Sequence, residues 1–247
     1  MYGSLLNNKL NNDNKFFNKI NEKFAKLTQF TVLLGSMLLG FVIFNSHTFV
    51  SLINLFLFNG TKKLYIHAEY VKEIIAAINL CNKYKLQFVL VGGSDAGLVL
   101  NLLKENNISV ILGRTHTLPN RDDDAIDAPY ALPKKLKDAG ILFALSCDGF
   151  WQVRNLPFMA GTAAAYGLNK EEALSAITND AAKITGMDQQ VGSISVGKDA
   201  TILICEGDLL DMKSSVIKQA FIQGRMIDID NIQHQLYEKY KKKYNLK

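Results

Sequence analysis

The chain has 247 residues, of which 48% are hydrophobic and 21% charged, with only four prolines, a composition that excludes disordered and collagen-like proteins. At about 150 residues per domain, this length predicts either one large domain or one domain with appendages. Residues 1–26 carry a net charge of +3 and residues 237–247 one of +4, so the residues between them carry −2 and no nucleic-acid partner is expected.

The N-terminal quarter divides into a polar and an apolar segment. Residues 1–29 are rich in Asn and Lys, whereas residues 30–58 contain no Asp, Glu, Lys or Arg. Twenty residues of this run would form a helix of about 30 Å, the thickness of a bilayer's hydrocarbon core. Because five lysines precede the run, it predicts a single membrane span with the N-terminus inside and the remaining domain on the far side. The alternative is a helix and strand buried in a soluble core, since Gly35 and Gly40 interrupt the run.

Short β-rich runs alternate with amphipathic stretches from Lys62 onward. This alternation is typical of βα units around a parallel sheet, so an α/β fold is expected. The predicted strands are Leu64–Ile66, Phe88–Val91, Val110–Leu112 and Leu142–Leu145. The predicted helices between them are Val71–Tyr84, Ala96–Glu105 and Pro133–Ala139.

The part of the chain after the fourth strand predicts short helices and then a small sheet. Asn169 and Glu172 have the spacing of a capping box and mark a helix start. Further elements are expected as a helix at Asp180–Ile184, a turn-strand-turn at Gly192–Asp199, β runs at Ala200–Cys205 and Ala220–Ile227, and a charged helix or tail from His234.

Side chains that suit chemistry follow the predicted strands where each strand ends. They are His67 after the first strand, Gly92 to Asp95 after the second, Arg114 and His116 after the third, and Asp148 after the fourth. Active sites of parallel β/α folds lie at these carboxyl ends. A neutral imidazole binds Zn²⁺, and a carboxylate both binds metal and accepts a proton from water. We therefore expect metal binding by His67 and Asp148, and substrate binding by Arg114 and His116.

Each of these residues also has a purely structural interpretation. A single histidine at a strand end is often a hydrogen-bonded structural residue. Asp148 precedes Gly149, and Asp-Gly pairs favour tight turns. His116 lies in a segment, Arg-Thr-His-Thr-Leu-Pro, that reads as a loop.

Four segments in the same order carry a resemblance to a known family. They are Leu64–Glu69 (LYIHAE), Phe143–Gly149 (FALSCDG), Tyr166–Leu174 (YGLNKEEAL) and Val191–Ala200 (VGSISVGKDA). From about residue 59 to residue 231, the chain resembles the C-terminal half of an amidohydrolase-superfamily protein of the imidazolonepropionase-like type. The resemblance implies strands 5–8 of a (β/α)₈ TIM-type barrel over residues 59–190, return strands of a small β-sandwich over 191–231, and a charged tail over 232–247.

The resemblance also implies a site that is only partly present. It makes His67 the metal ligand of strand 5 and Asp148 the acid/base of strand 8. The family's His-x-His pair of strand 1 does not occur in this chain, and Gly92 stands at the position of the strand 6 histidine. Catalytic zinc generally needs three protein ligands, and this chain supplies two, or three if His116 is recruited. A divalent metal, zinc, is therefore expected at low occupancy or not at all.

Two functions from different classes follow from these patterns. The first is a truncated amidohydrolase-family hydrolase that acts on carbon–nitrogen bonds other than peptide bonds in a small-molecule substrate, impaired alone or dependent on a missing half. Half a barrel leaves two open strand edges, so a second chain or self-association is expected to cover them. The alternative is a non-catalytic binding or scaffold remnant that keeps the cleft of His67 and Asp148 without its chemistry.

Overall fold

The structure, a computed structural model, describes residues 63–246. The expectations for residues 1–29 and 30–58, including the membrane span, lie outside this range. Within the described range, no helix is long and apolar enough to span a bilayer. Residues 63–246 form an α/β fold with one parallel and one antiparallel sheet.

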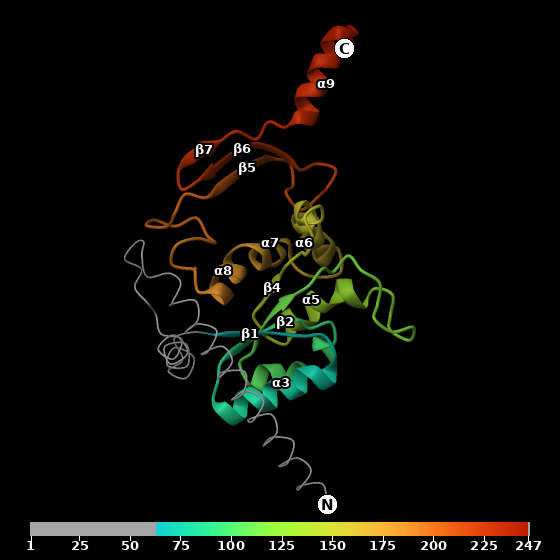
Figure 1. The fold of residues 1–247 in the computed structure, drawn as a ribbon, viewed down its shortest axis with the longest axis vertical. Helices are drawn as coiled ribbons and strands as arrows, with labels where there is room; N and C mark the ends of the chain where they lie inside the picture. The colour runs from blue at the N-terminus through green and yellow to red at the C-terminus, as the bar shows by residue number, and fades with distance from the viewer. Residues whose placement is uncertain (1–62, 247) are drawn as a thin grey trace, which may run out of the picture. The chain divides into compact units, whose positions relative to one another are not determined.

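The parallel sheet has four strands in sequence order, as the alternation of βα units predicts (Figure 1). They are β1 (Leu64–Ala68), β2 (Phe88–Gly92), β3 (Ser109–Leu112) and β4 (Phe143–Leu145). Consecutive residues Val89 and Leu90 of β2 are both buried, although they point to opposite faces. Both faces of the sheet are therefore covered at β2, which explains its continuous apolar run, whereas β1 at the edge exposes Tyr65 and His67 on one face.

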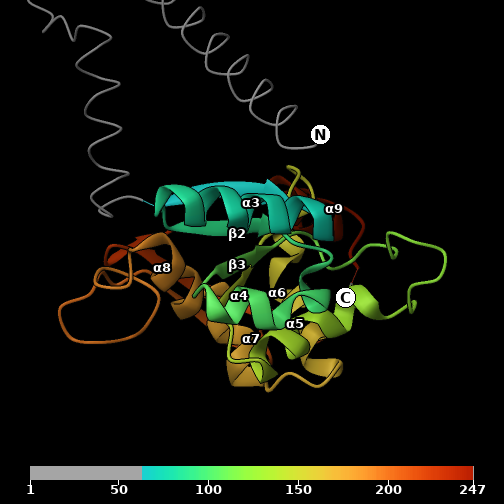
Figure 2. The same ribbon diagram turned by 90° about the horizontal axis from the view of Figure 1, so that it is seen from below.

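Helices follow the strands along the chain and bury their apolar faces against the sheet. They are α3 (Val71–Tyr84), the 3₁₀ turn η1 (Ala96–Leu98), α4 (Leu100–Glu105), α5 (Ala128–Asp138), the 3₁₀ turn η2 (Val153–Asn155), α6 (Leu156–Ala165), α7 (Lys170–Ile177) and α8 (Asn179–Thr185). The main core joins Leu90 and Val110 of the sheet to apolar residues of α3, α4 and α5. Figure 2 shows these three helices along the parallel sheet. On the other face, Ile184 of α8 packs against Val89 and Ala144.

Helix boundaries agree with the sequence where caps are strong and differ where proline is involved. The predicted bounds of α3 are correct. The capping box of α7 is also confirmed. The Asn169 side chain accepts from the Glu171 N–H at 2.9 Å, and Glu172 accepts from the Asn169 N–H at 3.2 Å. α5 begins five residues before Pro133, because Pro129 occupies its first turn, where a missing N–H costs nothing. The predicted helix 96–105 is divided into η1 and α4.

The antiparallel sheet contains β5 (Ile202–Glu206), β6 (Val216–Ile222) and β7 (Arg225–Ile227), and α9 (Ile232–Lys243) follows it. The single strand expected at residues 220–227 is wrong. Gln223 and Gly224 both have positive φ, so they form the two-residue turn of a hairpin. The strand expected within residues 192–199 is also wrong, because these residues form bends, irregular backbone and a turn at Val196 and Gly197.

The loop after β5 is fixed to the helices that follow the parallel sheet. Leu210 is buried in the main core, and its carbonyl lies so close to Gly161 of α6 that a Cβ there would collide with it. Lys170 at the start of α7 forms an ion pair with Asp208 at 2.6 Å. This close approach explains the glycine at position 161 of α6, because a residue with a Cβ would collide with the Leu210 carbonyl.

Candidate active site

A cleft of about 350 Å³ opens at the carboxyl ends of the parallel strands. Its walls come from the segments that follow all four strands. The polar lining residues include Glu69 and Tyr70 after β1, Ser94 and Asp95 after β2, Arg114, Thr115 and Asp124 after β3, and Asp148 after β4. The cleft is therefore built where a parallel β/α fold places its active site.

Of the four site residues predicted from the sequence, the structure brings two together. Arg114 and Asp148 both line the cleft. His67 is exposed on β1 and is not among the described residues that line it. His116 lines a different cavity, also of about 350 Å³, together with Thr162 of α6 and Lys170 of α7.

His116 joins the loop after β3 to α6. Its Nε2 lies 2.7 Å from the Thr162 hydroxyl oxygen, and the Thr162 hydroxyl donates to the carbonyl of Phe158 at 3.0 Å. A hydroxyl has one proton, so Nε2 of His116 must be the donor in the first contact. Burial, and then the positive charge of Arg114, hold the pKa of His116 below its ordinary value. The neutral ring thus forms a structural contact here.

The metal expected from the family resemblance does not fit the described residues. Residues 63–246 contain no group of three or more His, Cys, Asp or Glu side chains placed to hold a metal ion. A catalytic zinc site generally uses three protein ligands and a water. His67 and Asp148 alone therefore do not make a complete site.

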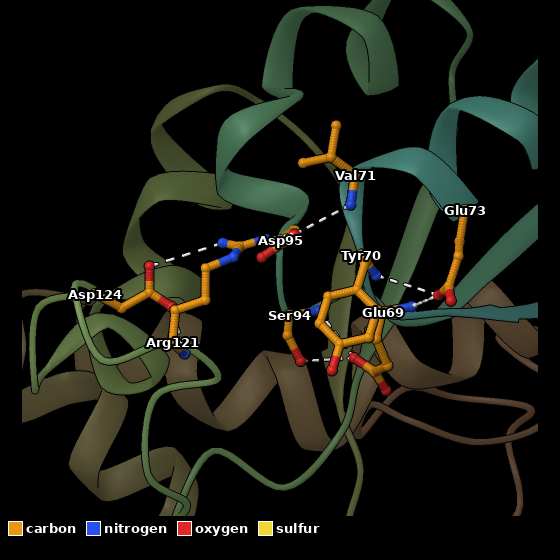
Figure 3. Close-up of polar contacts among 8 residues, drawn as sticks. All are labelled: Glu69, Tyr70, Val71, Glu73, Ser94, Asp95, Arg121 and Asp124. Atoms are coloured by element: carbon orange, nitrogen blue, oxygen red, sulfur yellow. Dashed lines mark hydrogen bonds and ion pairs between the residues drawn. The ribbon is translucent and has the colours of Figure 1, made fainter.

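An ion pair between the exposed Arg121 and the buried Asp95 holds the wall of the cleft in place (Figure 3). Asp95 is only 5% exposed, and its Oδ2 accepts hydrogen bonds from Nη2 of Arg121 at 2.5 Å and from the Val71 N–H at 3.1 Å. Arg121 also lies 3.7 Å from Asp124. The hydrogen bond and charge of Asp95 raise the pKa of the Arg121 guanidinium. This pair ties the loop after β3, which supplies much of the cleft, to the first turn of α3.

Glu69 is a second carboxylate of the cleft that the sequence analysis missed. Its Oε2 accepts from both the N–H and the hydroxyl of Ser94, at 3.0 and 2.6 Å (Figure 3). Its own N–H donates to Glu73 at 2.9 Å, so the backbone is held as well as the side chain. The available signal was an acidic residue just beyond a strand end, opposite a Gly-Gly-Ser segment.

The rim next to Asp148 combines opposite charges around a thiol. Burial raises the pKa of Cys147, the positive charge of Arg114 lowers it, and the negative charge of Asp148 raises it. The charges of Arg114 and Asp148 thus both influence the Cys147 thiol, in opposite directions. Thr115 is buried at 4% exposure, and its hydroxyl has no partner among the described residues. The cleft therefore offers a carboxylate that can accept protons and a guanidinium that can bind anions or carbonyl oxygens, while the Thr115 hydroxyl is buried behind its surface.

Comparisons with known proteins identify the family of this fold and cleft. The sequence profile of the Amidohydrolase family matches residues 58–227. An amidohydrolase of Thermotoga maritima has a similar fold, with a TM-score of 0.67 and 24% identity over 87% of this chain and 54% of that protein.

Curated imidazolonepropionases are similar in sequence. The protein of Symbiobacterium thermophilum is 37% identical over 119 residues, which are 44% of this chain and 28% of the relative. That of Streptococcus pyogenes is 26% identical over 184 residues, 66% and 40% of the two chains. The chain thus spans less than half the length of these curated relatives. The profile match over residues 58–227 shows that the chain belongs to the amidohydrolase family.

Proposed function

We propose that the protein is a hydrolase of carbon–nitrogen bonds other than peptide bonds, and that a second polypeptide completes its active site. The observation that carries this proposal is the cleft at the carboxyl ends of the parallel strands, where Asp148 and Arg114 face a common space. Membership of the amidohydrolase family and similarity to imidazolonepropionases support a small cyclic amide or imide as the substrate.

Asp148 and Arg114 have complementary parts in the proposed reaction. The Asp148 carboxylate is exposed after the last parallel strand, where it accepts a proton from the attacking water and returns it to the departing nitrogen. Arg114 donates hydrogen bonds to the substrate oxygen that gains negative charge as water adds to the carbonyl. His116 has no direct part in these steps, because it contacts Thr162 in the other cavity.

Two observations on residues 63–246 support a second polypeptide in this proposal. By family resemblance His67 and Asp148 would be this chain's share of a divalent-metal site, but His67 does not line the cleft of Asp148, and residues 63–246 do not supply a third ligand. In addition, β1 and β4 each have only one partner strand among the described residues. Open strand edges invite pairing with further strands. A second chain, or a second copy of this one, would cover both edges and add the remaining ligands.

The test compares this chain alone with a fusion in which residues 63–246 follow the amino-terminal half of the Thermotoga maritima amidohydrolase. Both are assayed for turnover of small cyclic amides and imides, including imidazolonepropionate. We expect turnover only with the fusion, and a loss of about 10²–10⁴-fold for Asp148→Asn in the fusion, because general acid–base catalysis contributes this much. Glu105→Asn, an exposed carboxylate of α4 outside the cleft, is the matched control. A folded, active fusion that is insensitive to Asp148→Asn would contradict the proposal.

A further inference from the structure

We propose that Glu69 and Tyr70 form a subsite for a positively charged nitrogen, an ammonium or guanidinium group, of the ligand that occupies the cleft. This inference rests on the proposed function, because it specifies the class of substrate that the same cleft would accept. It adds a recognition role for the segment after β1, which the sequence analysis left without one.

The first argument is that Glu69 is fixed through one oxygen only. Oε2 accepts both hydrogen bonds from Ser94, at 3.0 and 2.6 Å (Figure 3). Oε1 has no hydrogen-bond partner among residues 63–246, although a carboxylate oxygen accepts up to two. A carboxylate that is held in this way loses little further freedom when it binds a donor, so it is preorganised for a ligand.

The second argument is that the backbone makes room for this carboxylate. Gly92 ends β2 with φ +94°, a conformation that side-chain-bearing residues rarely adopt. A Cβ at this position would overlap Oε1 of Glu69. Oε1 of Glu69 therefore occupies the space that a side chain at position 92 would fill. Glu69 and Gly92 both line the cleft.

The third argument is the surroundings of Glu69, which suit a cation. Tyr70 lines the same cleft with its side chain half-exposed, at 48%. An aromatic face beside a carboxylate is a favourable environment for ammonium and guanidinium groups. Glu73 accepts from the backbone N–H groups of both Glu69 and Tyr70, at 2.9 and 3.3 Å, and so fixes the segment that carries the pair.

The charge balance of the cleft supports the same conclusion. The charge of Asp95 is compensated by Arg121. The remaining charged lining residues are the carboxylates of Glu69, Asp124 and Asp148 and the guanidinium of Arg114, so the cleft keeps an excess of two negative charges. A cleft lined mainly by one sign of charge concentrates ligands of the opposite sign. Because Arg114 lies in the same cleft, the complete ligand would be dipolar, with its cation at Glu69.

Binding of n-butylguanidinium and of n-butylurea, its neutral isostere, tests this inference. The purified full chain is titrated with each compound and followed by ligand-observed NMR. We expect n-butylguanidinium to bind at least tenfold more tightly than n-butylurea. Glu69→Gln should weaken its binding by about 10–100-fold, the range for loss of a hydrogen bond to a charged group. The isosteric Glu105→Gln variant of α4 removes one negative charge outside the cleft and should bind like the parent chain.

Ser94→Ala gives a second test that keeps the charge of Glu69. Loss of the Ser94 hydroxyl removes one of the two bonds to Oε2 and should weaken n-butylguanidinium binding by several-fold, because the carboxylate is less well ordered. Thermal unfolding of each variant shows whether it is folded. The inference is wrong if n-butylguanidinium does not bind, or if it binds the Glu69→Gln variant as tightly as the parent chain. It is also wrong if Zn²⁺, and not n-butylguanidinium, is the cation whose binding depends on Glu69.

These titrations involve no turnover, so they separate the subsite from the catalytic proposal. Binding that depends on Glu69 in a protein that fails the fusion assay would retain the subsite and refute the hydrolase. Turnover that depends on Asp148 in a protein that does not bind n-butylguanidinium would support the hydrolase and refute the subsite.

Discussion

Replacing Asp95 by alanine removes the acceptor on which the wall of the cleft depends. The Asp95 carboxylate is 5% exposed and binds the Val71 N–H and Nη2 of Arg121 through one oxygen. Without it, the part-buried Val71 N–H loses its acceptor, at a cost of about 1–3 kcal/mol. The charge-assisted bond to Arg121 is lost as well, but this adds little to the cost because Arg121 is 39% exposed and regains hydrogen bonds to water.

The expected total for Asp95→Ala is therefore a loss of about 1–3 kcal/mol, a sizeable part of the ~5–15 kcal/mol by which a domain is usually stable. Asp95→Asn should cost less, because an amide oxygen can still accept from the Val71 N–H. Asp122→Asn is the matched control, since Asp122 is exposed and forms no hydrogen bond or ion pair within residues 63–246.

Urea unfolding of the full chain, followed by far-UV circular dichroism and by the fluorescence of Trp151, measures these differences. The expected order of stability is parent and Asp122→Asn, then Asp95→Asn, then Asp95→Ala. Raising the salt concentration should change the order little, because the part-buried hydrogen bond from the Val71 N–H to Asp95 carries most of the difference and is weakly screened. Asp95→Ala within about 0.5 kcal/mol of the parent, the usual range for surface substitutions, would refute the structural role given to this pair.

Two further predictions concern the packing around α6. Gly161→Ala should destabilise the fold by about 1–3 kcal/mol, because its Cβ collides with the Leu210 carbonyl, whereas Gly113→Ala has no neighbour within 4 Å and should be nearly neutral in the same urea experiment. His116 has a lowered pKa in the folded chain, so its contribution to stability is complete above its ordinary value and is lost as the pH falls through that value toward the folded one. Between pH 7.5 and 5.5 the parent should therefore lose more stability than His116→Gln, and equal losses would show that His116 is not the titrating group.

The sequence predicts the parallel sheet well because its signals are local. Each strand is a short apolar run, and the predicted and observed boundaries differ by at most two residues. The capping box at Asn169 and Glu172 is equally local. The hairpin at Gln223 and Gly224 was missed, because a continuous β-rich stretch conceals a two-residue turn when its residues are not a typical pair.

The cleft was less predictable, because its contacts join residues distant in the sequence. Arg114 and Asp148, expected at the carboxyl ends of the strands, both line the cleft, and their roles in substrate and metal binding stay predictions. The positions of His116 and Glu69 depend on how loops fold over the strand ends. His116 turns toward Thr162, 46 positions away, and Glu69 is fixed by Ser94, 25 positions away. No periodicity in the sequence reports contacts of this kind.

The most direct test of the central claim is a joint measurement of zinc content and turnover on the purified full chain by itself. If the active site needs a second polypeptide, zinc should be well below one equivalent per chain, and small cyclic amides and imides should remain intact. One tightly held zinc ion per chain, together with steady hydrolysis of a lactam or imide, would contradict the claim.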